Sequence, residues 1–416
     1  MKKGFLTFLG NAKDILFCLT FLILGLSLFS SCGDDSEGRI KLNDVAPAQV
    51  TNVQQEAGPG EIYFTWNIPS SESFMYTKVT YTTSKGEEKY LLFSKDHADK
   101  NGVMKATVSG FANTDPVKFL FYACSVHGNS QQPVEVEGIP GTPAFALMAE
   151  SIDITPDYGG VQVSWKNESV ASVFVVLEYQ AKSDASKAGS IRFSVEANSE
   201  SSRFVPFSYG EGDVLSGEAC DVKVYTQDSE ENSSDIRTFE TIPLKVNKMD
   251  RSSWTFPGFK DTCDGTVGYS SQEPKEGGYP QGRVVAMLDG DTNTYWHSSW
   301  SMNTVYPHFF IVDMGKDVMV SNVSLRRRTG NSNSHTGQTF YTCTEAGVTN
   351  PSNSEAWAWD NQGWFSFDPT TDVTQVYKLN TPKMARYLKV YFAASDRGLT
   401  DWCFLSELNI FEPAEN

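Results

Sequence analysis

Alternating apolar and polar residues predict short strands in the first two thirds of this 416-residue chain. Residues 60–66 and 160–165 alternate in this way and each segment ends on a tryptophan, which is typical of a strand with one buried face. An Ile-Pro pair follows later in each copy, at 139–140 and 242–243, and no helical period interrupts the strands. The pattern predicts two copies of a small β-sandwich. Further strands are expected at 76–81, 117–126, 172–179 and 219–225.

The two copies resemble fibronectin type III or immunoglobulin-like modules, and the resemblance makes Trp66 and Trp165 the core tryptophans of the second strand. Either ring is an alternative candidate for a ligand groove, but large aromatic side chains are mostly buried, which favours the core. Cys124 and Cys220 lie in corresponding strands of the two copies. We expect both to be buried free thiols that pack as small apolar groups.

The N-terminal segment has the order of a secretory signal. Two lysines precede an apolar run at 15–29, which is shorter than the ~20 residues that a membrane-spanning helix needs. Ser30-Ser31-Cys32 then resembles a bacterial lipobox, with Phe29 as a departure from its pattern. The resemblance implies cleavage before Cys32 and acylation of that residue, while ordinary signal cleavage is the alternative. The acidic segment 33–38 predicts a flexible tether and resembles the surface-export signal of Bacteroidota lipoproteins, which implies a lipid anchor exposed on the outer membrane.

A different pattern occupies the last part of the chain. Asp289, Asp291 and Thr294 place oxygen atoms around the glycine of a turn, and such hard ligands suit calcium. Trp296 follows as the first buried side chain of a strand would. His297 and Trp300 are three residues apart and offer a hydrogen-bonding ring beside a flat apolar face.

This turn and the segments after it resemble the coagulation factor V/VIII type C, or discoidin-like, domain, and within it the galactose-binding modules of carbohydrate-binding family 32. The resemblance covers roughly the last 165 residues, a usual size for one domain, and it implies a β-sandwich of the jelly-roll type. The matching segments, in the order of the family, are 289–297, 309–315, 323–328, 385–390 and 405–411.

The resemblance implies a structural calcium ion. Its ligands would be the side chains of Asp289 and Thr294, the carbonyl of Asp291, and Glu407 folding back beside the turn. In the alternative interpretation, Asp289 only caps the turn and Glu407 is a solvated residue at a strand edge.

The resemblance also implies a sugar site built from His297, Trp300, Arg328 and Asn333, because Arg328 and Asn333 keep the family's five-residue spacing. A late aromatic residue would complete it, with Trp402 or Phe404 as candidates, and an upstream carboxylate would come from Glu273 or Glu276. The alternative is a rim of solvated polar residues. The segment 342–347 departs from the family, and one of Trp357, Trp359 and Trp364 is expected in the core while another reshapes the binding face.

The composition and the missing motifs argue against several classes of function. A formal net charge of −17 argues against nucleic acid as a partner, and Arg326, Arg327 and Arg328 would alternate between faces of a strand rather than form a patch. Seven cysteines without Cys-x-x-Cys spacing indicate neither a zinc site nor a disulfide scaffold. The sequence carries no Gly-x-Ser-x-Gly, His-Glu-x-x-His or P-loop motif.

The sequence therefore predicts an all-β, non-enzymatic surface lipoprotein that binds a glycan, with galactose-containing glycans as the candidate, and serves polysaccharide capture together with uptake machinery. An adhesion or assembly protein whose last domain binds protein is the alternative, followed by an accessory part of a glycoside hydrolase system. The predicted segments are a signal peptide (1–31), a tether (32–45), two fibronectin III/Ig-like domains (46–141 and 142–248) and a discoidin-like domain (249–416).

Overall fold

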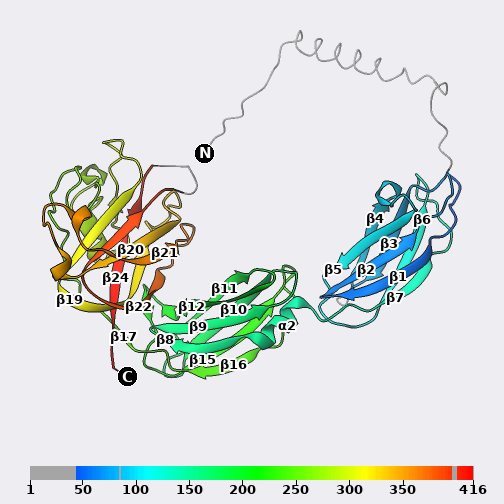
Figure 1. Ribbon diagram of the computed structural model, residues 1–416, viewed down its shortest axis with the longest axis horizontal. Coiled ribbons are helices and arrows are strands. Elements are labelled where there is room, and N and C mark those ends of the chain that lie inside the picture. The colour runs from blue at the N-terminus through cyan, green and yellow to red at the C-terminus, as the bar shows by residue number, and fades with distance from the viewer. Residues whose placement is uncertain (1–43, 84–85, 396–400, 416) are drawn as a thin grey trace, which may run out of the picture. The chain divides into compact units, whose positions relative to one another are not determined.

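The computed structural model describes residues 44–83, 86–395 and 401–415, and its sheets are antiparallel (Figure 1). Cys32 and the predicted signal segment lie outside the described residues. In the part of the chain that is described, no helix has the length and apolar character needed to span a membrane. The chain forms two compact units. The first consists of residues up to Glu56, Tyr63–Thr107 and Pro116–Gly138, and the second of Ala57–Ile62, Val108–Asp115 and the chain from Ile139 onward.

The first sandwich packs a three-stranded sheet on a four-stranded one, and its core is aromatic. Phe64 and Trp66 point inward from β2 and meet Phe119 and Phe121 of β6, with the ring centroids of Phe64 and Phe119 4.8 Å apart. Trp66 is 1% exposed, and its indole N–H donates to Oγ1 of Thr77, so it is a core residue. The three-stranded sheet has the order β1 (Thr51–Gly58), β2 (Glu61–Asn67) and β5 (Val103–Ser109). The four-stranded sheet has the order β4 (Glu88–Ser94), β3 (Tyr76–Thr82), β6 (Val117–Cys124) and β7 (Val134–Gly138). A 3-10 turn, η1 (Lys95–His97), follows β4.

The second sandwich has the same plan with an aliphatic core. Val161 and Val163 of one sheet and Val175 and Leu177 of the other are fully buried in one cluster. Trp165 is half-buried and tilts against Phe193 at 5.4 Å, so it covers the edge of the core. The strands are β8 (Asp153–Asp157), β9 (Gly160–Asn167) and β12 (Ser199–Pro206), then β10 (Val173–Ala181), β11 (Ala188–Val195), β15 (Cys220–Gln227) and β16 (Arg237–Thr241), with the small pair β13 (Ser208–Tyr209) and β14 (Asp213–Val214).

One helix departs from the all-strand pattern expected for this region. Helix α2 (Ala144–Ser151) precedes β8 and buries Ala144, Phe145, Met148 and Ala149 against the second sandwich. These positions lie on one helical face. Two turns are too short to produce a period that stands out among flanking strands.

The C-terminal domain has a six-stranded sheet and a short two-stranded ribbon. Trp296 is fully buried and packs on Phe310 at 5.5 Å and on Phe392 at 6.0 Å, which joins the ribbon to the sheet. The sheet order is β17 (Val246–Lys248), β24 (Glu407–Pro413), β19 (His308–Arg326), β22 (Gln375–Phe392), β20 (Gly337–Cys343) and β21 (Asp360–Ser366). The ribbon pairs β18 (Trp296–His297) with β23 (Phe404–Leu405). The 3-10 turns of the domain are η2 (Pro274–Glu276), η3 (Val284–Leu288), η4 (Glu345–Gly347) and η5 (Ser354–Ala356).

The outer face of this sheet carries a second, smaller core. Trp357 is buried there with Ile311, Cys343 and Tyr387, and Trp359 packs against it. Trp364 is 60% exposed on β21 instead. The five described cysteines are free thiols, and Cys124 and Cys220 are buried as expected.

Candidate functional site

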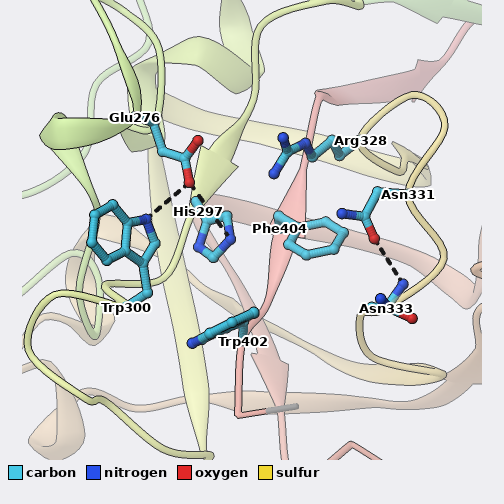
Figure 2. A pocket seen from close by; sticks show the side chains of 8 residues that line it. All are labelled: Glu276, His297, Trp300, Arg328, Asn331, Asn333, Trp402 and Phe404. Carbon is cyan, nitrogen blue, oxygen red and sulfur yellow. Dashed lines mark hydrogen bonds and ion pairs between the residues drawn. The ribbon is translucent and has the colours of Figure 1, made fainter. Parts of the chain in front are cut away.

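A pocket of about 370 Å³ lies at the ribbon of the C-terminal domain (Figure 2). His297 pairs with Phe404 across the ribbon, while Trp296 pairs with Leu405. Because side chains alternate along a strand, Trp296 and Leu405 enter the core and His297 and Phe404 line the pocket. Trp402 lies two residues before Phe404 and also lines it.

His297 is positioned as a hydrogen-bond acceptor. Its Nδ1 lies 2.6 Å from the carbonyl oxygen of Ser298, which can only accept, so Nδ1 carries the proton. Burial lowers the pKa of His297, which keeps the ring neutral near pH 7. Its Nε2 therefore presents a lone pair. The nearest carboxylate oxygen, Oε1 of Glu276, is 3.8 Å from that nitrogen and too far for a hydrogen bond.

Glu276 fixes one wall of the pocket. Its Oε1 accepts from the indole N–H of Trp300 at 2.9 Å, and its Oε2 accepts from the hydroxyl of Tyr295 at 2.6 Å. These bonds hold the Trp300 ring at the rim, where it is 39% exposed. The carboxylate thus orients the aromatic ring.

Arg328 supplies the donor. Its guanidinium lies 4.0 Å from the ring centroid of Tyr295 and has no hydrogen-bond or ion-pair partner among the described residues. His297 and Arg328 both flank the ring of Phe404, with centroid distances of 5.2 and 5.8 Å. Tyr295 therefore supports the pocket twice, through its ring under Arg328 and its hydroxyl on Glu276.

The other two arginines of the run have different partners, although β19 ends at Arg326 and the run does not alternate along a strand as expected. Arg327 is buried and binds Asp372 at 2.7 Å and the carbonyl of Pro369 at 2.6 Å. Arg326 pairs with Glu211. Only the last arginine of the run is available to a ligand.

Figure 2 shows the pocket walls: Trp300 and Trp402 flank His297, while Arg328 and the asparagines lie on the other side of Phe404. Trp402 is 43% exposed. Asn331 and Asn333 belong to the loop after β19, and the backbone N–H of Asn333 donates to Oδ1 of Asn331 at 2.9 Å. The pocket combines two accessible indole rings with an acceptor, Nε2 of His297, and a cationic donor, Arg328.

The domain that carries this pocket matches a known family. The F5/8 type C domain matches residues 267–408. The C-terminal domain is an F5/8 type C domain. A domain of unknown function, DUF4959, matches residues 47–140 and so covers the first sandwich. Among curated proteins, none matches the chain.

Three solved structures illustrate what the chain is similar to. The family 32 carbohydrate-binding module of NanJ from C. perfringens, in complex with galactose, is 17% identical and covers 40% of this chain and 100% of its own, with a TM-score of 0.31. The C-terminal domain of a chitobiase from Bacteroides fragilis is 22% identical, with coverage of 41% and 100% and a TM-score of 0.33. A SusE-like protein is 16% identical, with coverage of 65% and 99% and a TM-score of 0.32.

The five predicted sugar-site residues of the F5/8 type C domain line one pocket: His297, Trp300, Arg328, Asn333 and Trp402. Glu276 and Phe404, which the sequence left as alternative candidates, line the pocket as well. Glu273 is buried elsewhere: although burial raises its pKa, bonds from Ser301 and Ser299 hold the pKa below its usual range. Of the three tryptophans at 357, 359 and 364, none lines the pocket.

Sequence reasoning missed Asn331 and Tyr295. The Asn-x-Asn spacing of 331 and 333 is a usable signal, since both side chains come from one turn. Tyr295 carries no such signal, because its two contacts come from Glu276 and Arg328, which are distant in sequence.

The residues predicted for calcium do not fit that ion in this arrangement. Asp289 closes its own turn, accepting from the hydroxyl of Thr294 at 2.7 Å and the backbone N–H of Asp291 at 2.8 Å. Glu407 is 5% exposed and forms an ion pair with Arg251 at 2.6 Å. The guanidinium of Arg251 therefore already pairs with the carboxylate that the calcium hypothesis needs as a ligand. The burial of Glu407 excludes the alternative in which this residue is solvated.

Proposed function

We propose that the F5/8 type C domain binds a glycan in this pocket and catalyses no reaction on it. The proposal rests on the neutral Nε2 of His297 and the guanidinium of Arg328, which flank the same Phe404 ring, with two exposed indoles beside the histidine. A sugar hydroxyl donates and accepts at once, so it suits an acceptor beside a donor. The C–H face of the sugar packs on an indole ring.

The shape of the pocket favours a glycan over a protein ligand. A volume of about 370 Å³ is in the range of small-ligand sites, and its polar groups converge. Adhesion to a protein would call for a broad exposed apolar face instead. Galactose is the first candidate, because its axial 4-hydroxyl leaves the opposite face apolar, so that one face meets the histidine and arginine and the other an indole.

The cellular part of the proposal is capture of a polysaccharide at the cell surface for uptake. Acylated Cys32 would anchor the chain in the outer membrane, and the two sandwiches follow the tether as spacer modules before the binding domain. A single-sugar site makes few contacts, so its Kd should be about millimolar to tens of micromolar. Many copies facing a repetitive polymer would strengthen the binding.

A glycan array probed with the chain from Gly33 onward tests the function. We expect signals on glycans with terminal galactose or N-acetylgalactosamine, confirmed by calorimetry with the free sugars. An array without any glycan signal, while the protein is folded, would exclude the proposal. Retention of a protein partner by the same surface would support the adhesion alternative.

Removing the Trp300 ring should weaken glycan binding about tenfold. Covering one sugar face removes some tens of Å² of apolar surface from water, at about 25 cal/mol per Å². Trp364→Ala is the matched control, because Trp364 is also exposed but does not line the pocket. Calorimetry on Trp300→Ala and Trp364→Ala should separate them, and equal affinities would remove Trp300 from the site.

Replacement of Cys32 tests the anchor. Cys32→Ala should abolish labelling of the protein with a fatty-acid probe in cells, because neither thioether nor amide acylation at that residue can then occur. The labelled wild type and a Ser31→Ala variant are the controls. Undiminished labelling of Cys32→Ala would show that the chain is not anchored through this residue.

A further inference from the structure

The C-terminal domain contains a half-buried arginine that joins three separate segments. Nη2 of Arg251 lies 2.6 Å from Oε2 of Glu407, at the start of β24. Its Nη1 donates to the carbonyl of Leu408 at 2.6 Å and to that of Met287, in η3, at 3.3 Å. The side chain is 17% exposed. One guanidinium therefore connects the start of the domain, η3 and the last strand.

The same guanidinium lies against the turn of Asp289. A Cβ added to Gly290 would be 3.6 Å from Nη2 of Arg251. Burial raises the pKa of Glu407, and the negative charge of Asp289 adds to this rise. The guanidinium of Arg251 opposes the rise because its positive charge stabilises the ionised carboxylate. Oε1 of Glu407 is buried without a hydrogen-bond partner among the described residues.

We propose that Arg251 is the internal cation of this domain and stands where the fold family would place calcium. Calcium requires six to eight oxygen ligands at about 2.3–2.6 Å. Here the guanidinium itself occupies the position, because it contacts Oε2 of Glu407 and the carbonyls of Met287 and Leu408. The arginine neutralises the buried glutamate and satisfies carbonyls of η3 and β24. The closure of the domain is therefore independent of metal.

Arg251→Ala removes the cation and leaves the Glu407 carboxylate and the carbonyls of Met287 and Leu408 around the emptied position, next to the turn of Asp289. These are the hard ligands that calcium prefers. The variant should gain a dependence on calcium that the wild type lacks, because a ligand that binds only the native state raises its stability.

Thermal unfolding of the full chain from Gly33 tests the proposal. Tryptophan fluorescence reports mainly on this domain, which holds all of the nine tryptophans except Trp66 and Trp165. Wild-type Tm should be the same in excess EDTA and in millimolar calcium chloride. In EDTA the Tm of Arg251→Ala should fall by about 6–15 °C, because a buried carboxylate loses its partner. Calcium should restore several degrees of that loss, whereas magnesium should not.

Three results would overturn the assignment: a wild-type Tm that rises with calcium, an Arg251→Ala variant as stable as the wild type, or a destabilised variant that ignores calcium. Arg251→Lys covers the case in which the alanine variant does not fold. A lysine retains the charge but cannot contact the carboxylate and both carbonyls together, so Tm should fall by less and stay independent of calcium. Terbium luminescence of the wild type, sensitised by the aromatic residues, should show no saturable site.

Discussion

Calorimetry on the Arg328→Ala variant is expected to show glycan affinity about 10- to 150-fold weaker than that of the wild type. Hydrogen bonds to a charged group contribute about 1.5–3 kcal/mol, and about 1.4 kcal/mol corresponds to a factor of ten. The Arg328 guanidinium has no competing partner among the described residues, so its donors are available to the sugar. With a wild-type Kd near millimolar, the heat of binding should fall below detection.

Two variants separate recognition from general charge effects. Arg192→Ala removes an exposed arginine that also lies over an aromatic ring, Phe174, in the second sandwich, and it should bind normally. Arg328→Lys keeps the charge without the planar fork and should give an intermediate affinity. Unchanged affinity in Arg328→Ala would show that the sugar lies elsewhere.

Acidification should destabilise the C-terminal domain through its buried histidines. His335 is fully buried between Phe367 and Phe392, and burial lowers its pKa to about 3. Burial also lowers the pKa values of His297 and His308. Unfolded histidine has a pKa of about 6.5, so above that value no proton is taken up on unfolding. Below it the unfolded chain binds protons that the folded chain excludes, and the free energy of unfolding falls.

For His335 alone the loss is about 1.4 kcal/mol per pH unit between pH 6.5 and about 3, which is about 3 kcal/mol at pH 4.5. The free energy of unfolding in urea, followed by tryptophan fluorescence from pH 7.5 to 4.5, measures the slope. His335→Phe retains the packing on the two phenylalanines and should have a slope smaller by about 1.4 kcal/mol per unit. Parallel wild-type and variant curves would mean that His335 is not a buried neutral base.

The strands could be predicted because burial imposes a visible alternation. Residues 60–66 and 160–165 read as half-buried strands, and the structure has β2 and β9 there. The pocket could be approached through spacing, since His297 and Trp300 come from one ribbon end and Arg328 and Asn333 from one strand end.

What sequence could not supply depends on contacts between distant segments. Glu276 and Glu273 are equally good candidates in the sequence. Only the packing of their loop directs Glu276 to Trp300 and Glu273 to Ser299. Arg251 meets Leu408 across 157 positions, so no local pattern reveals that it accompanies Glu407. The calcium hypothesis depended on matching ligand oxygens, and their spacing in the sequence does not show the ion pair between Arg251 and Glu407.

At the two-residue ribbon, a core residue and a pocket residue, Trp296 and Trp300, are only four positions apart in the sequence. Trp296 and Leu405 belong to the core, whereas Trp300, Asn331 and Trp402 stand on loops that lead away from it. Substitutions at these three loop positions change the pocket rim without opening a cavity. Selection from a library that varies them, with the ribbon left intact, therefore offers a route to binding domains of new preference on an unchanged scaffold.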